Sequence, residues 1–485
     1  MSIEVTPRVD AGSGERVGER ADRAPSRFSR RLVGTIVVLA LVVCGFAFAN
    51  IAQGPRLNSG TIDAERAALL AGQQLTLEVN QPVASLDAAD VEVEPATAVT
   101  TDVDGRTVVV TFETPLAYAT EYTVRVPGVV GTAQASSATL EYRFTTPRVD
   151  VYSLIRRSER GEPDVVQRRP LGAAEPATVF EAPRVQEFAH AGDLLLAATV
   201  DDDGANSLFV TDMTEGGPQQ IGLPPEAEIR DLAASTTNPV AGFVLTSPDV
   251  GGVRDFDDTL MVVDLSGAGA VDPTPVLGLD GSPLRVSDWA FVPGTTSVVV
   301  QDVEQSVFVV DVWGGRPVSP LGVHTELRGF VPGTTQLIVA DPDRGVRFDL
   351  ADGSVTTLEV ASADLADHVY PGPITMLDGR SRYLISLVAA TVEGDRNMRS
   401  SILAEVDEAG GLREVFAPAD EASLIREYCV SPNAQYVAVA QSPEPGSVDG
   451  YSENPGFTEM MTTVVEIATG RTVMSSVGGF SEWCS

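Results

Sequence analysis

The chain contains Phe291-Val292-Pro293-Gly294-Thr295-Thr296 and, 39 residues later, Phe330-Val331-Pro332-Gly333-Thr334-Thr335. In both copies Pro-Gly predicts a tight turn. An apolar run follows each turn, from Ser297 to Val300 and from Gln336 to Val339. A strand, a turn and a second strand therefore recur in this part of the chain.

A second, four-residue pattern recurs along the last three hundred residues. It consists of an apolar residue, a small or polar residue, usually an acid, and a large apolar or aromatic residue. The copies are Val185-Gln186-Glu187-Phe188, Ile229-Arg230-Asp231-Leu232, Val286-Ser287-Asp288-Trp289, Leu327-Arg328-Gly329-Phe330, Ile425-Arg426-Glu427-Tyr428 and Phe480-Ser481-Glu482-Trp483, with a degraded copy at Val369. Spacings of 41 to 57 residues, filled by short β-rich runs, predict a β-propeller over residues 148–485 with one four-stranded blade per repeat. We call this pattern the inner-strand motif.

The last copy of the motif begins a blade where the given sequence stops, so the other strands of that blade must come from elsewhere. Residues 149–156 and 165–169 are strand-like and precede the first full blade. We therefore expect a composite closing blade, because an open ring would leave unpaired backbone groups at its edge. This gives seven blades, with six or eight as alternatives.

Residues 57–147 form an earlier unit of alternating apolar and polar runs, the period of half-buried strands. About seven short strands in this unit predict an antiparallel sandwich. The run from Pro115 to Val126 and the closing Tyr142-Arg143-Phe144-Thr145-Thr146-Pro147 resemble the bacterial Ig-like domains of S-layer and other surface proteins. That resemblance implies a spacer or adhesion module. Similarly, the run from Cys429 to Val439 resembles the Ser-Pro-Asp-Gly blade of TolB-like propellers, with Asn433-Ala434 in place of Asp-Gly.

The N-terminal region has the composition of a membrane anchor. Residues 1–31 carry seven arginines and five acids and are expected to form a disordered cytoplasmic tail. Residues 32–52 are predicted to be a single transmembrane helix, since 18 residues from Leu32 to Ala49 lack a charge. The flanking arginines place the later domains outside the cytoplasm. Cleavage after Ala49 and lipidation at Cys44 are the alternatives.

Charge and composition restrict the partners. Outside the tail, 26 arginines and 63 acids give a net charge of −37, which repels nucleic acid and anionic lipid. The chain has no lysine, a bias typical of GC-rich genomes such as those of actinobacteria. Cys429 and Cys484 follow the aromatic residue of consecutive motifs, and an oxidising compartment favours a disulfide between them; two free thiols are the alternative.

Three insertions between second and third strands, at residues 247–258, 391–400 and 443–456, are expected to emerge on one face of the ring beside the motif acids. They predict an acidic rim with aromatic residues that binds a protein, peptide or glycan of the cell envelope. The alternative is that these loops vary freely and that the acids only begin strands. The candidate binding residues are Glu187, Asp231, Asp288, Glu427, Glu482, Asp255, Phe256, Asp257, Asp258, Asp395 and Tyr451.

No catalytic constellation is evident, and no metal site or cofactor is predicted. Asp201-Asp202-Asp203-Gly204 and Asp341-Pro342-Asp343-Arg344-Gly345 offer oxygen ligands of the type that Ca²⁺ takes, but both fit hairpin turns better. The sequence thus favours a non-enzymatic, membrane-anchored scaffold outside the cytoplasm. An exported polysaccharide hydrolase or lyase with a carboxylate pair is the alternative.

Overall fold

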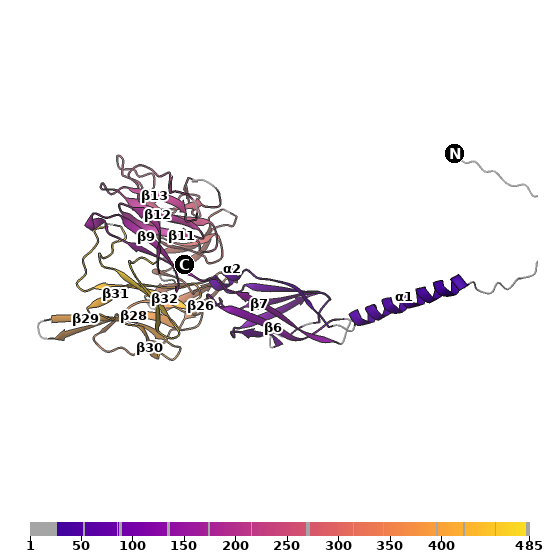
Figure 1. The fold of residues 1–485 in the computed structure, drawn as a ribbon. Coiled ribbons are helices and arrows are strands. Elements are labelled where there is room, and N and C mark those ends of the chain that lie inside the picture. The colour runs from indigo at the N-terminus through magenta and orange to yellow at the C-terminus, as the bar shows by residue number, and fades with distance from the viewer. Residues whose placement is uncertain are drawn as a thin grey trace, which may run out of the picture.

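The computed structural model describes residues 27–51 and 54–481, with gaps at 85, 87–89, 133–135, 173–174, 215, 268–271, 314, 343, 394–395, 421 and 452. Strands dominate this part of the chain. A helix, a sandwich and a larger set of sheets follow one another along it (Figure 1).

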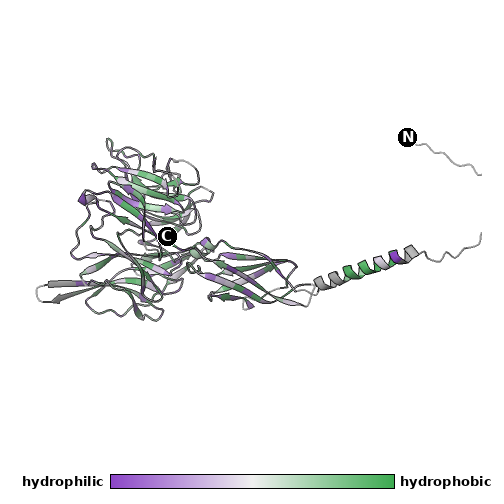
Figure 2. Cartoon of the chain, viewed as in Figure 1, coloured by the Kyte–Doolittle hydropathy of each residue, from purple (hydrophilic) through white to green (hydrophobic). Residues whose placement is uncertain are grey.

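Helix α1 (Arg27–Ile51) precedes the sheets. Its described apolar side chains, such as Leu32 and Val43, are exposed, and Figure 2 shows the middle of this helix in the hydrophobic colour. Within the described residues, no helix has both the length and the hydropathy needed for a membrane span. The transmembrane helix predicted at residues 32–52 is therefore not supported, and most of the predicted tail lies outside the described residues.

The first unit is a sandwich of two antiparallel sheets. One sheet has the order β1 (Leu57–Thr61), β2 (Gln74–Val79), β5 (Thr107–Phe112), β4 (Val99–Asp104), and the other β3 (Glu92–Glu94), β6 (Glu121–Val130), β7 (Ser137–Thr145). Alternate residues point inward, so Leu75 and Leu77 pack in one core with Val108, Val110 and Val124. The alternating runs in the sequence thus correspond to strands of a sandwich.

A short helix in the sandwich was not predicted. Helix α2 (Ala64–Leu69) follows β1, and the Asp63 side chain caps it by accepting a hydrogen bond of 3.0 Å from the backbone N–H of Arg66. Six residues are too few to show a helical period, so the cap is the main signal in the sequence.

Seven antiparallel sheets follow in sequence order among the described residues. The first has three strands and the other six have four. The strands are β8 (Asp150–Ile155), β9 (Asp164–Pro170), β10 (Ala177–Ala182); β11 (Val185–Ala191), β12 (Leu194–Val200), β13 (Asn206–Asp212), β14 (Gln219–Ile221); β15 (Glu228–Ala234), β16 (Val240–Thr246), β17 (Thr259–Asp264), β18 (Thr274–Pro275); β19 (Val286–Phe291), β20 (Ser297–Asp302), β21 (Ser306–Asp311), β22 (Ser319–Val323); β23 (Glu326–Phe330), β24 (Gln336–Asp341), β25 (Arg344–Asp349), β26 (Ser354–Leu358); β27 (Val369–Met376), β28 (Tyr383–Glu393), β29 (Arg396–Val406), β30 (Leu412–Phe416); β31 (Ser423–Val430), β32 (Tyr436–Pro443), β33 (Met461–Glu466) and β34 (Arg471–Val477).

Neighbouring sheets share cores, which is the packing expected of a propeller-like array. Leu196 of β12 and Phe243 of β16, for example, belong to one buried cluster. One predicted insertion is different from expectation, because residues 391–400 extend the β28–β29 hairpin instead of forming a loop. Asp395, a predicted rim residue, lies outside the described residues.

The end of the described chain returns to the first sheet. Gly479 and Leu154 exchange two backbone hydrogen bonds of 3.0 Å, which places the segment after β34 beside β8. The three-stranded sheet thereby gains an inner neighbour from the other end of the chain. This is the contact expected of a composite closing blade, and it leaves Leu154 at no open edge.

The sandwich contacts the turns that join the first and second strands of two sheets, β19–β20 and β23–β24. Arg66 donates to the carbonyl of Gly294 over 3.0 Å, and the Ala71 N–H donates to the carbonyl of Gly333 over 2.8 Å. Both glycines come from the repeated Pro-Gly turns. At Gly333, where φ is +67°, an added Cβ would lie 2.3 Å from Cγ of Pro115. This turn therefore requires glycine both for its backbone conformation and for the approach of the sandwich.

Candidate functional site

The inner-strand motif marks a β-bulge in six sheets. The pairing of the first two strands is irregular at Val185/Glu187, Arg230/Ala233, Val286/Asp288, Leu327/Gly329, Pro371/Ile374 and Ile425/Glu427. A bulge bends the strand and changes the direction of its side chains. At two of these bulges, motif residues bond to the next sheet, namely Gln186, Glu187 and Arg230.

In two copies of the motif, the second residue joins successive sheets. Nε2 of Gln186 donates to the carbonyl of Ile229 over 2.6 Å, and Nη2 of Arg230 donates to the carbonyl of Val286 over 2.9 Å. In both cases the acceptor is the first residue of the next motif. Arg156, just after β8, makes the corresponding bond to the carbonyl of Gln186 over 2.5 Å.

Two motif acids also join sheets. The Leu232 N–H donates to Oε2 of Glu187 over 2.7 Å, and the Phe480 N–H donates to Oε1 of Glu427 over 2.9 Å. Burial raises the pKa of Glu187 to about 7 and raises the pKa of Glu427, although these N–H donors oppose the rise. Both carboxylates therefore have a role between sheets that requires no ligand and no chemistry.

The other two motif acids differ in environment. Burial raises the pKa of Asp288 to about 6, and its carboxylate accepts a 2.7 Å bond from the Trp289 N–H. Asp231 is exposed, has a positive φ of 54°, and pairs with Arg230. Glu482 lies outside the described residues.

A cavity of about 320 Å³ opens beside these acids, and we call it the mouth cavity. Its lining contains three carboxylates and one guanidinium, and that guanidinium already bonds to Val286 and Asp231. The mouth cavity therefore has an excess of negative charge and suits a cation. It is lined by Glu187, Phe188, Arg230, Asp231, Leu232, Glu453, Asn454, Phe480 and Ser481.

The insertion at residues 443–456 folds over the joint between the last and first sheets. Asp449 and Arg156, whose side chains are 2% and 4% exposed, form an ion pair of 2.5 Å. The Arg156 guanidinium lies 3.9 Å from the ring centre of Tyr451 and 4.1 Å from that of Phe480. The Tyr451 hydroxyl bonds to Asp164, which is fully buried. We call these five residues the closing cluster.

Tyr451 was predicted to bind a ligand at the rim, but it is only 4% exposed. Its ring and hydroxyl are used within the closing cluster, because the insertion packs down onto β8 and β9 instead of projecting into solvent. The geometry thus assigns Tyr451 to ring closure.

The insertion at residues 247–258 is also held to its own sheet. Phe256 packs against a buried cluster, and Asp257 pairs with Arg285 over 2.8 Å. Asp258 accepts from Arg230 over 3.3 Å. Asp255 is exposed. Of the four rim candidates in this loop, only Asp255 therefore lies free of the contacts that fix the loop.

Cys429 is 8% exposed, whereas Cys484 lies outside the described residues. The disulfide between them stays a prediction.

The proposed calcium segments behave as turns. Oδ1 of Asp201 accepts from the N–H groups of Asp203 and Ala205, which is the bonding of a tight loop. Asp341 pairs with His324 over 3.3 Å. Within the described residues, no group of three or more His, Cys, Asp or Glu side chains is placed to hold a metal ion.

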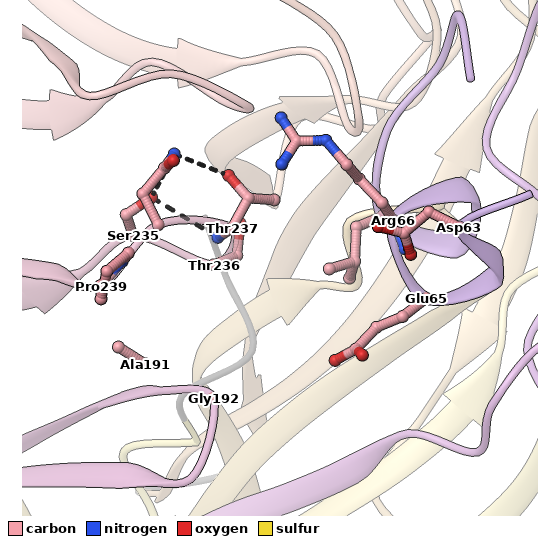
Figure 3. Close-up of a pocket in the computed structure, with 11 residues that line it drawn as sticks. Asp63, Glu65, Arg66, Ala191, Gly192, Ser235, Thr236, Thr237 and Pro239 are labelled. Carbon is pink, nitrogen blue, oxygen red and sulfur yellow. Dashed lines mark hydrogen bonds between the residues drawn. The ribbon is translucent and has the colours of Figure 1, made fainter. Parts of the chain in front are cut away.

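A second hollow region lies at the opposite ends of the inner strands, where the sandwich meets the sheets (Figure 3). Sequence reasoning missed it. The signal was the repeated Pro-Gly turn, since both copies contact the segment that follows Asp63. Nδ2 of Asn433 adds a third such contact, to the carbonyl of Leu116 over 3.0 Å.

Residues 52–146 match the family model of the bacterial Ig-like domain. No curated protein matches the sequence. A protein from Lactobacillus plantarum is similar at 14% identity and a TM-score of 0.40, over 70% of this chain and 98% of that one. A putative TolB from Agrobacterium tumefaciens is similar at 11% identity and a TM-score of 0.30, over 68% and 90%.

A puromycin-hydrolyzing peptidase from Mycobacterium tuberculosis is similar at 16% identity and a TM-score of 0.41, over 67% of this chain and half of that one. Likeness at this level concerns the fold alone. The predicted S-layer type and actinobacterial origin receive no support from these comparisons. The comparisons show a bacterial Ig-like domain at residues 52–146.

Proposed function

We propose that this chain is a non-enzymatic, extracytoplasmic binding and scaffold protein of the cell envelope, and that its mouth cavity holds a basic side chain of a protein or peptide partner. The Ig-like domain, in contact with the hairpin turns, is the spacer that presents the other face of the sheets. Bacterial Ig-like domains favour a role outside the cytoplasm.

One observation carries the proposal, namely the composition of the mouth cavity. The exposed Asp231 and the half-buried Glu453 line it together with Glu187, while Arg230 is the one guanidinium among the described lining residues and is already bonded to Asp231 and to the carbonyl of Val286. The net charge of −35 adds a long-range attraction for basic partners. An arginine or lysine side chain is long enough to enter such a cavity and to place its charge among the carboxylates.

The test is fluorescence anisotropy of a labelled hexa-arginine peptide with the full chain, at low and at physiological salt. Asp231→Asn combined with Glu453→Gln is expected to weaken binding about tenfold, equivalent to ~1.4 kcal/mol. Asparagine tolerates the positive φ of residue 231, so this variant should fold.

The matched control removes charge without touching the cavity. Glu408→Gln with Asp407→Asn changes two exposed acids in the β29–β30 turn, at the other end of the sheets. This variant should keep the affinity within about twofold, since surface charges that are remote from the site are screened by salt. An equal loss in both variants would show unspecific attraction, and no loss in either would remove the mouth cavity from consideration. Saturable binding of a neutral oligosaccharide, without peptide binding, would also overturn the proposal.

A further inference from the structure

The hollow between the sandwich and the sheets consists of two adjoining cavities of about 310 and 250 Å³. Both are lined by Glu65 and Leu69 from α2 and by Gly192 and Thr236 from turns of the sheets. They therefore adjoin, and we call the two together the interdomain cleft; Figure 3 shows the larger of the two cavities. Clefts at domain interfaces are preferred positions for small ligands.

Several charged groups around the interdomain cleft already have partners. Arg168 and Asp150 form an ion pair of 2.5 Å, so neither needs a ligand to balance its charge. The Arg66 guanidinium donates to the carbonyl of Gly294, which occupies one of its donors.

Three charged groups of the smaller cavity remain without a hydrogen-bond or ion-pair partner among the described residues, namely the carboxylates of Glu65 and Asp193 and the guanidinium of Arg148. The hydroxyl of Thr236, at the junction of the two cavities, also has no partner among the described residues. The smaller cavity thus presents two unpaired carboxylates, one unpaired guanidinium and a neutral hydrogen-bonding group.

We propose that the interdomain cleft binds a small zwitterion, a free amino acid or the end-to-end charges of a short peptide. The ligand's ammonium group pairs with Glu65 and its carboxylate pairs with Arg148, in the bidentate geometry that a guanidinium favours. The Thr236 hydroxyl forms hydrogen bonds with the polar groups that lie between the ligand's two charges. Because Glu65 belongs to the Ig-like domain and Thr236 to the sheets, the bound ligand contacts both and stabilises their docking.

The test is isothermal titration calorimetry of the full chain with triglycine, N-acetyl-triglycine and triglycine amide. The acetyl group removes the cation and the amide removes the anion, without altering the rest of the peptide. Triglycine is expected to bind, and each blocked form should bind about tenfold more weakly or not at all. Equal heats from all three peptides, or no saturable binding of triglycine up to about 10 mM, would overturn the proposal.

Variants locate the site. Glu65→Gln and Arg148→Gln should each weaken triglycine binding about tenfold, and in Glu65→Gln combined with Asp193→Asn the penalty for blocking the peptide's amine should disappear. Asp202→Asn, an exposed acid in the β12–β13 turn on the mouth side, should bind as the wild type does. Unfolding curves for each variant separate loss of binding from loss of fold. Well-folded Glu65 and Arg148 variants with unchanged affinity would contradict the assignment.

Discussion

Replacing Glu187 by glutamine should change how the stability of the sheets depends on pH. The Glu187 side chain is buried, its pKa is about 7 in the folded chain, and the ordinary value is 4.5. A raised pKa means that the folded chain binds more protons than the unfolded chain between these two values. Wild-type stability is therefore highest below the unfolded pKa and falls as pH rises through the folded pKa. Glutamine can still accept from the Leu232 N–H but has no proton to lose.

The magnitude follows from the size of the shift. At 1.36 kcal/mol per pKa unit, the rise from 4.5 to about 7 corresponds to about 3 kcal/mol. For a cooperative unit of roughly 330 residues, this is equivalent to ~4 °C in Tm. The Tm of Glu187→Gln is therefore compared with that of the wild type at each pH. The difference, variant minus wild type, should rise by ~4 °C between pH 4.5 and pH 8.

Tryptophan fluorescence is the appropriate assay. The three tryptophans, Trp289, Trp313 and Trp483, all lie after the Ig-like domain, so the signal reports on the sheets. Asp202→Asn is the control, because its carboxylate is exposed and its replacement should give a flat difference. A Glu187→Gln difference that is independent of pH, or that falls as pH rises, would refute the reasoning.

Three further predictions concern closure and docking. Arg156→Met should lower the stability of the sheets by about 3–5 kcal/mol, since it leaves the buried Asp449 without a counterion. Adding Asp449→Asn should recover part of the loss. No recovery in Tm would argue against the closing cluster. Gly333→Ala should weaken the contact between the Ig-like domain and the sheets more than Gly353→Ala does. Both glycines have a positive φ, but only a Cβ at residue 333 would meet Pro115. Small-angle scattering compares the two variants, and identical curves would contradict the docking contact. Non-reducing peptide mapping should recover Cys429 linked to Cys484, and alkylation of both as free thiols would contradict the disulfide.

The periodicity of the sequence predicted the sheets well, for a physical reason. Alternation such as that of Leu75 and Leu77 is a local consequence of one face being buried, so it can be read without knowing the partner strand. The recurrence of the inner-strand motif likewise accompanies a bulge that six of the sheets repeat. These signals lie within a few residues of the structures they specify.

The roles of the acids could not be predicted because their partners are distant in sequence. Glu187 accepts from a residue 45 positions away, and Tyr451 bonds to Asp164 over a separation of 287. Both residues look like surface groups in a loop or at the start of a strand. Only the fold shows that the first joins two sheets and the second lies beneath an insertion. The interdomain cleft was missed for the same reason, since Glu65 and Thr236 meet only after the two domains dock.

Photo-crosslinking tests the central claim about the mouth cavity most directly. A hexa-arginine peptide with a terminal benzophenone would be bound to the full chain, irradiated and mapped by mass spectrometry. Crosslinks should concentrate at Phe188, Leu232 and Asn454, which line the mouth cavity, and should be lost in the Asp231→Asn, Glu453→Gln variant. Crosslinks spread over the acidic surface, and unchanged in that variant, would contradict the proposed site.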